Sequence, residues 1–344
     1  MIELHAVAEP QPGARFQARF EATWPAYRAW YLRDGDAARP SYLACRHALE
    51  LHMPELVPTY ERLVQLAGGG DLAARMLSLY DPPALVTGCS QAVLTRPEPL
   101  LVRNYDFDPK LLEGVIALTA YTGRRVLGMS DCLWGLLDGV NNAGLAMSLA
   151  FGGRRVTAPG FAMPLVVRYL LELCATTREA VAVLARLPVQ AAYNLTIVDR
   201  EGDAVTAHVG PDHAADIGRA LVATNHQRTV DWPEHAEAVR SQEREQCMLD
   251  LLEAGAGEED FVAAFLEPPL RSTGYDNGFG TLYTAVYRPL DAAVEYRWPG
   301  LTWRQSCAGF EEGMRAVRLP SSKPSSDSSH DEPGQENSAL PSTG

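Results

Sequence analysis

The pair Gly88-Cys89 has the residue types that covalent chemistry needs. A cysteine thiol becomes a nucleophile when a base takes its proton, and the usual base is a histidine. No histidine lies within about 30 residues of Cys89 on either side, although one could approach in space. Two interpretations follow: Cys89 is a buried core thiol, which is the common role of a free cysteine, or its base is of another kind.

Cleavage of the Gly88–Cys89 bond would supply such a base. Cys89 would then carry a free α-amino group, whose pKa of about 7.7–8.0 suits proton transfer near neutral pH. Gly88 lacks a Cβ atom, and we expect this to permit the unusual backbone geometry of a self-cleaving bond. On spacing alone a core or strand-end thiol is the commoner role, and a nucleophile produced by self-cleavage is the alternative.

Arg103 and Asp106 lie on the next predicted strand, across a short turn from Cys89. An arginine near a thiol favours the thiolate, and an aspartate near an amino group would orient it. Side chains alternate along a strand, so positions 103 and 106 face opposite sides unless the strand bulges or ends between them. A surface ion pair is the alternative interpretation.

Asn141 and Asn225 end two other predicted strands and could donate amide hydrogens to an oxyanion. Asparagine beside glycine is common in turns for conformational reasons alone, and this applies to Asn141. Asn225 lies in Thr224-Asn225-His226, which contains no turn-forming Gly or Pro.

The surrounding pattern predicts the elements that position these residues. Residues 14–80 show helical spacing of apolar residues, and Thr176 with Glu179 forms a capping box before a later helix. Strands joined by short turns predict antiparallel pairing, so we expect an α+β fold of two antiparallel sheets with helices outside. The predicted strands and helices after residue 80 are 84–94, 99–107, 115–121, 124–129, 134–140, 145–152, helices 164–175 and 176–187, 191–199, 203–210, 220–226, helix 233–253, 280–287 and 292–298.

Composition sets broad limits on function. The chain has 344 residues and a net charge of −13, which argues against nucleic acid or an anionic membrane as the main partner. We find no signal peptide and no membrane-spanning run. The six cysteines are widely spaced, which predicts neither disulfides nor a zinc site and favours a cytoplasmic location. Residues 319–344 are rich in Ser, Pro, Asp and Glu and are predicted to be a disordered tail.

Five motifs in order resemble the acyl-coenzyme A:6-aminopenicillanic acid acyltransferase family, which are N-terminal-nucleophile (Ntn) hydrolases related to choloylglycine hydrolases. The resemblance covers about residues 14–310. Its motifs are Gly88-Cys89, Arg103-Asn104-Tyr105-Asp106-Phe107, Gly139-Val140-Asn141-Asn142-Ala143-Gly144-Leu145-Ala146, Thr224-Asn225-His226 and Gly280-Thr281-Leu282-Tyr283.

The resemblance implies a four-layer αββα sandwich and a precursor that cuts itself before Cys89. Residues 1–88 would stay bound as a mostly helical segment beside a catalytic core of residues 89–318. Cys89 would be nucleophile and base. Asn225 would be an oxyanion donor, Asn141 would lie beside the nucleophile, and Asp106 would contact its amino group.

Tyr105 and Arg271 are the substrate-binding candidates. Two positions depart from the acyltransferase pattern: Arg103 stands where that family has Gln, and Leu270-Arg271 replaces Cys-Arg.

The resemblance further implies a small-molecule acyl substrate, an amide or a thioester. Coenzyme A thioesters are candidate co-substrates, although the sequence has no phosphate-binding motif for one. No metal or organic cofactor is expected, and the oligomeric state is left open. The alternative is an uncut Ntn-like protein that either uses His226 as base for Cys89 or only binds a ligand.

Overall fold

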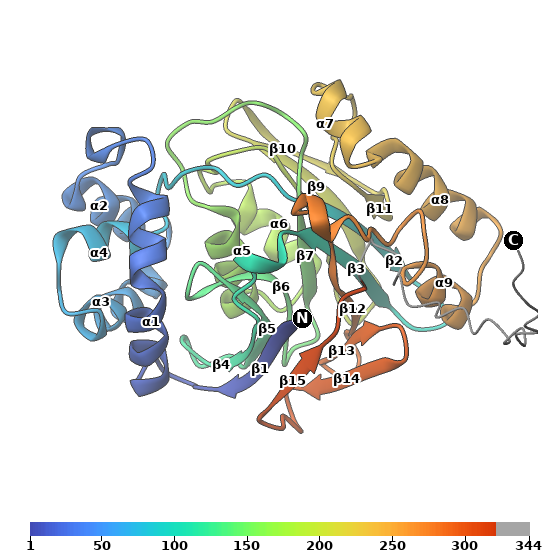
Figure 1. Cartoon of the computed structure of the whole chain (residues 1–344), viewed down its shortest axis with the longest axis horizontal. Helices are drawn as coiled ribbons and strands as arrows, with labels where there is room; N and C mark the ends of the chain where they lie inside the picture. The colour runs from blue at the N-terminus through green and yellow to red at the C-terminus, as the bar shows by residue number, and fades with distance from the viewer. Residues whose placement is uncertain (321–344) are drawn as a thin grey trace, which may run out of the picture.

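The computed structural model describes residues 1–320 of the chain and contains two stacked β-sheets (Figure 1). The strand order is β10-β9-β8-β7-β6-β5-β4-β1-β15 in one sheet and β11-β2-β3-β12-β13-β14 in the other. The larger sheet comprises β1 (Ile2–Ala8), β4 (Val115–Thr119), β5 (Val126–Asp131), β6 (Gly135–Asn141), β7 (Ala146–Phe151), β8 (Tyr193–Val198), β9 (Ala204–Gly210), β10 (His213–Gly218) and β15 (Gly313–Val317). The smaller sheet comprises β2 (Gly88–Leu94), β3 (Leu100–Phe107), β11 (Val222–Ala223), β12 (Gly280–Arg288), β13 (Ala293–Trp298) and β14 (Leu301–Ser306).

Helices cover the outer face of each sheet. On the larger sheet, α5 (Met163–Leu173) packs against β6, and α6 (Thr177–Leu184) follows it. Gly135 and Gly139 let α5 approach, because a Cβ at either position would lie within 3 Å of Pro164 or Leu171. On the smaller sheet lie α7 (Pro233–Ala238), α8 (Ser241–Glu253) and α9 (Glu258–Ala264) (Figure 1).

A separate group of helices lies beside these four layers (Figure 1). It consists of α1 (Ala14–Tyr31), α2 (Tyr42–His52), α3 (Val57–Leu66) and α4 (Asp71–Leu77), which pack on one another. The predicted α+β class and the αββα layering are confirmed.

Strand alternation decides which side chains lie between the sheets. Gln91 on β2 accepts a hydrogen bond from Ser148 Oγ (2.6 Å) and donates one to the Asn194 carbonyl (3.1 Å), both on the larger sheet. Odd-numbered β2 residues therefore face the larger sheet. Even-numbered ones such as Ala92 pack with Met248 of α8 and belong to a second core beneath the helices.

Several elements differ from the predictions. The helix predicted over 233–253 is two helices, since Arg240 between them adopts φ +52° in the left-handed region. The strand predicted over 220–226 is only β11. The sequence interpretation also missed β1, β10, β14, β15 and α9. The N-cap before α6 is confirmed, since the Thr176 side chain accepts from the Glu179 amide (3.3 Å), whereas the Glu179 carboxylate accepts from the amide of Ala175 (2.7 Å) instead of that of Thr176.

Every strand pairing is antiparallel within residues 1–320 except that of β1 with β4, which is parallel. Among the described residues, no helix has both the length and the apolar character needed to cross a membrane. The tail predicted from residue 319 lies, from residue 321 on, outside the described residues.

Candidate active site

Cys89 is the second residue of β2, and its side chain lies between the two sheets, fully buried. Its Sγ atom is 3.4 Å from Arg103 Nη2, which donates to it, and 3.9 Å from Thr87 Oγ1. Burial raises the pKa of the Cys89 thiol, while the charge of Arg103 opposes the rise. The guanidinium thus favours ionisation of a thiol that its surroundings otherwise keep neutral.

Arg103 is held by a buried network behind the thiol. Its guanidinium forms an ion pair with Asp138 of β6 and donates to Tyr283 Oη (3.1 Å). Asp138 also accepts hydrogen bonds from Tyr283 (2.6 Å) and Tyr287. A buried charge is stable only when paired, so this network fixes where the guanidinium points.

Asp138 is not among the residues predicted from the sequence. A signal was present, however, because a single carboxylate inside the predicted buried strand "WGLLDGV" requires a buried partner.

The backbone nitrogen of Cys89 has its own partner. It donates to Asn225 Oδ1 at 2.9 Å. The Asn225 amide group donates in turn to the carbonyls of Thr87 and Phe151, each at 3.1 Å. Asn225 lies two residues after the end of β11, and β11 pairs with β2, so the sheet itself brings Asn225 to Cys89.

Asp106 lies on the opposite face of β3, beneath α8. Its carboxylate accepts from Thr281 Oγ1 (2.6 Å) and lies 3.5 Å from Arg244 Nη1. Arg244 also donates to the Cys89 carbonyl (2.6 Å) and to Asn225 Oδ1 (2.7 Å). Burial raises the pKa of Asp106, which Arg244 partly offsets, and burial lowers the pKa of Arg244, which Asp106 partly offsets.

Arg244 was missed because its helix, "SQEREQCMLDLLE", has the charged composition of a solvated surface. The sequence of this helix contains no signal that one of its charged side chains is buried.

The β2–β3 register explains why the side chains of Arg103 and Asp106 lie on opposite faces of the smaller sheet. It runs without a bulge from Gly88 opposite Asp106 to Leu94 opposite Leu100. Arg103 therefore reaches the thiol, while Asp106 lies opposite Gly88 and is linked to Cys89 through Arg244, which donates to the Cys89 carbonyl. Strand alternation predicts opposite faces for the two side chains unless the strand bulges or ends between them, and the unbroken register places them so.

Gly88 is needed for a different reason from the one expected. It begins β2 in ordinary strand conformation, so conformational freedom is not used there. A Cβ at this position would lie 2.1 Å from the Phe279 ring and 3.2 Å from Asp106 Cβ. Space, not backbone strain, excludes a side chain.

Asn141 does not lie at the nucleophile. Position 141 is three residues beyond Asp138 on β6 and faces α5, so its amide donates to the carbonyls of Leu171 (2.8 Å) and Cys174 (2.7 Å). Its Oδ1 accepts from the Ala143 and Leu145 amides. The predicted place of Asn141 beside Cys89 is therefore wrong, because its polar atoms close the turn after β6.

Arg271 is also apart from Cys89. It lines a cavity of about 540 Å³ with Tyr275, and the described residues include no contact between Arg271 and Cys89. Burial raises the pKa of Tyr275 and Arg271 lowers it. Tyr105, by contrast, is directly opposite Cys89 in the sheet.

His226 points away from the thiol. Its Nδ1 lies 2.8 Å from Ser241 Oγ and its Nε2 lies 3.1 Å from Glu245 Oε2, both on α8. Both ring nitrogens are thus occupied on the helix side of the smaller sheet. Within residues 1–320, no group of three or more His, Cys, Asp or Glu side chains is placed to hold a metal ion.

Two facing sheets between helical layers, with a buried cysteine near the start of an inner strand, define the class of Ntn hydrolases. The sequence profile of the family described as acyl-coenzyme A:6-aminopenicillanic acid acyl-transferase matches residues 93–302, more than half of the chain. The chain belongs to this family, which makes it an enzyme of the amide-hydrolase and acyltransferase type. No curated protein matches it.

Solved structures with a similar fold include three hydrolases. A conjugated bile acid hydrolase from Clostridium perfringens is 11% identical with a TM-score of 0.43, and the match covers 67% of this chain and 97% of that one. An N-acylethanolamine-hydrolyzing acid amidase ortholog from Caenorhabditis elegans is 17% identical with a TM-score of 0.45, covering 59% and 93%. Penicillin V acylase from Agrobacterium tumefaciens is 15% identical with a TM-score of 0.38, covering 64% and 86%. At these identities and scores the assignment rests on the family match.

Proposed function

We propose that the chain cuts itself between Gly88 and Cys89 and then uses Cys89 as an N-terminal nucleophile in amide hydrolysis or acyl transfer. The supporting observation is the double anchoring of one buried residue. The Cys89 nitrogen is held by Asn225 and the Cys89 thiol by Arg103, with no histidine at either atom among the described residues. Such anchoring suits a residue whose own nitrogen serves as base.

Self-cleavage begins with attack of the Cys89 thiol on the Gly88 carbonyl carbon. The Gly88–Cys89 amide bond breaks, Gly88 becomes a thioester on the sulfur, and the nitrogen leaves as an amine that takes the thiol proton. Water then hydrolyses the thioester and releases residues 1–88 with a new carboxylate. The amine remains within reach of Asn225 Oδ1 and is the base for later turnovers.

The oxyanion donor follows from the bonds that cleavage breaks. Both hydrogens of the Asn225 amide are occupied in the uncut chain, one of them by the Thr87 carbonyl. Thr87 belongs to the segment released from Cys89. Its departure would free one N–H for the carbonyl oxygen of a substrate, and a donor of this kind contributes about 3 kcal/mol of transition-state stabilisation.

Asp106 acts through Arg244 in this proposal. Arg244 bridges the Cys89 carbonyl, Asn225 and Asp106, so Asp106 holds the group that positions both the nucleophile and the oxyanion donor. Arg103 stabilises the thiolate, and Tyr105 forms a wall beside it. Asn141 and Arg271 have no part in the reaction at Cys89.

The substrate donates an acyl group to Cys89 from a small-molecule amide or a thioester, for which coenzyme A thioesters are the candidates that the family's description supports. Water completes hydrolysis, and an amine completes acyl transfer. We also retain the cytoplasmic location, because all six cysteines are free.

Intact-mass measurement of the purified full chain tests the proposal. We expect two fragments, residues 1–88 and 89–344, for the parent chain and for Cys247→Ala, and one uncut chain for Cys89→Ala. Cleavage and activity should survive His226→Gln, because His226 contacts α8 and not the thiol. An uncut but active parent chain that loses activity on His226→Gln would establish the alternative, in which His226 is the base.

A further inference from the structure

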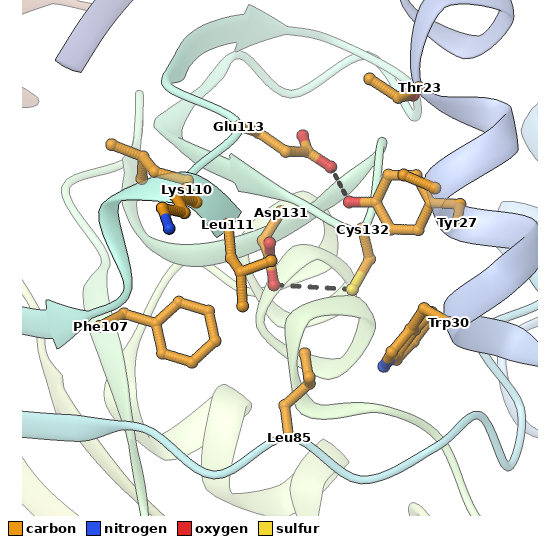
Figure 2. Close-up of a pocket in the computed structure, with 12 residues that line it drawn as sticks. Thr23, Tyr27, Trp30, Leu85, Phe107, Lys110, Leu111, Glu113, Asp131 and Cys132 are labelled. Atoms are coloured by element: carbon orange, nitrogen blue, oxygen red, sulfur yellow. Dashed lines mark hydrogen bonds between the residues drawn. The ribbon is translucent and has the colours of Figure 1, made fainter. Parts of the chain in front are cut away.

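A cavity of about 240 Å³ lies between α1 and the end of β3 (Figure 2). Its walls are mostly apolar and aromatic, with Tyr27 and Trp30 on α1 facing Phe107 across the space. Its lining side chains are Thr23, Ala26, Tyr27, Trp30, Leu85, Phe107, Lys110, Leu111, Leu112, Glu113, Asp131 and Cys132. A space of this size equals that of about eight water molecules at roughly 30 Å³ each.

The cavity leads toward the nucleophile. A narrower cavity of about 20 Å³ shares Trp30, Leu85, Asp131 and Cys132 with it and continues to Thr87 and Tyr105. Tyr105 is opposite Cys89 in the sheet, and Thr87 Oγ1 is 3.9 Å from its sulfur. Residues 85 and 87 precede the proposed cleavage site, so their movement after cleavage would join the larger cavity to the thiol.

One of the two carboxylates that line the cavity already accepts several hydrogen bonds. Glu113 accepts hydrogen bonds from the Leu133 amide (2.6 Å), from Ser130 Oγ (3.2 Å) and from the Tyr27 hydroxyl. These three donors hold it against the wall, as Figure 2 shows for Tyr27.

Asp131 is the other carboxylate, and it lines the cavity between Leu111 and Cys132 in the view of Figure 2. Its carboxylate accepts from the Cys132 thiol at 3.5 Å, a weak donor, and from the Cys132 backbone amide, and no Lys, Arg or His within residues 1–320 forms an ion pair with it. Burial and the nearby charge of Glu113 raise the pKa of Asp131 to about 7, while the Cys132 hydrogen bonds and the more distant Arg103 oppose the rise.

The chemistry of the cavity selects one kind of occupant. Glu113 and Asp131 outnumber the one cation of the lining, Lys110, which forms no ion pair with Asp131 within residues 1–320, so the cavity disfavours an anion. A plain alkyl group would desolvate Asp131 without giving it a partner. An organic ammonium would supply the missing positive charge, and the faces of Tyr27, Trp30 and Phe107 favour such a cation.

We propose that this cavity binds the acyl part of the substrate and selects acyl groups that end in an ammonium, which pairs with Asp131. That the ligand is a substrate rests on the proposed function, whereas the binding test of the cavity is independent of that function. The volume suits a chain the size of a 6-aminohexanoyl group, with the ammonium at the end remote from the reacting carbonyl.

Binding to the full-length Cys89→Ala chain tests the cavity without catalysis. Titration calorimetry would compare hexylammonium with 1-hexanol, which has the same shape but no charge. We expect hexylammonium to bind at least about tenfold more tightly, as a charge-assisted hydrogen bond replaces a neutral one. Adding Asp131→Asn should abolish the preference, and Glu98→Gln, which removes an exposed carboxylate from the β2–β3 turn, should leave it intact.

Equal binding of the two probes overturns the inference even if Asp131→Asn fails to fold, because that comparison uses the intact Asp131. Turnover supplies a second measure: the cut enzyme should have the higher kcat/KM for 6-aminohexanoyl-p-nitroanilide than for heptanoyl-p-nitroanilide. Preference for the heptanoyl compound also overturns it. Absence of self-cleavage counts against the proposed function alone, since the binding comparison remains decisive for the cavity.

Discussion

Replacing Asp138 by Asn would remove the anion that holds Arg103 behind the thiol. Both side chains are fully buried, so no water can take over the pairing. Tyr283 donates to Asp138 Oδ2 and Tyr287 donates to Oδ1, so an asparagine keeps an acceptor oxygen for only one of the two hydroxyls, and the loss includes this hydrogen bond as well as the ion pair.

Breaking a buried ion pair by removing one partner costs about 3–5 kcal/mol, because the remaining charge is stranded. Arg103→Met strands Asp138, whose two tyrosine donors reduce the cost to about 2–4 kcal/mol. The double variant strands neither charge and should cost only about 0–2 kcal/mol, less than Asp138→Asn alone. The coupling between the two sites is therefore at least about 3 kcal/mol.

Urea unfolding of all four proteins measures this coupling. Each would carry Cys89→Ala, so that every protein is one uncut chain, and coincident transitions by fluorescence and circular dichroism would establish two-state behaviour. An Asp138→Asn cost below about 1 kcal/mol, additive with Arg103→Met within about 0.5 kcal/mol, would refute the argument that the pair is energetically coupled. As a control, Glu312→Gln removes an exposed partner of Arg15 and should change stability little.

Three further predictions concern cleavage and stability. Gly88→Ala should block self-cleavage, since the new Cβ meets the Phe279 ring. Adding Phe279→Ala should restore the two fragments in the mass spectrum, and blocked cleavage in this double variant contradicts a steric cause. Arg244→Met and Arg244→Lys should both greatly slow cleavage in a mass time course, because neither reproduces the bridge between the Cys89 carbonyl, Asn225 and Asp106, and full cleavage by the lysine variant contradicts this. The raised pKa of Asp131, about 7 against about 3.9 when unfolded, means that the folded state binds the extra proton between these values. The stability that Asp131 contributes therefore falls as pH rises from about 4 to 7. Asp131→Asn should gain stability relative to the parent across that range, and a difference in urea midpoint that does not change with pH contradicts this prediction.

Local pattern was sufficient for most of the fold, because hairpins and amphipathic helices depend on neighbours in sequence. The hairpins β4–β5, β6–β7 and β12–β13 and the helices α5 and α6 all lie where periodicity and turn residues predict them. The break between α7 and α8 has no such signal: Arg240 is not a residue that normally ends a helix, yet it adopts the left-handed conformation between them.

The residues of the candidate site differ in the same way: some are predictable from the local sequence and others are not. Cys89, Arg103 and Asn225 come together because β2 pairs with β3 and with β11, a relation that the motifs already imply. Arg244 lies on α8, which has the composition of a surface helix, and Asp138 lies on the larger sheet. Their selection requires the packing of the two sheets, which no spacing along the chain encodes.

The position of β1 bears on how a cut molecule would hold together. This strand lies inside the larger sheet, parallel to β4 on one side and antiparallel to β15 on the other. Departure of residues 1–88 would leave β15 without a neighbour and turn β4 into an unprotected edge, open to pairing with other chains. The two pieces would thus behave as one particle through purification, and denaturant, not dilution, is the treatment that would separate them.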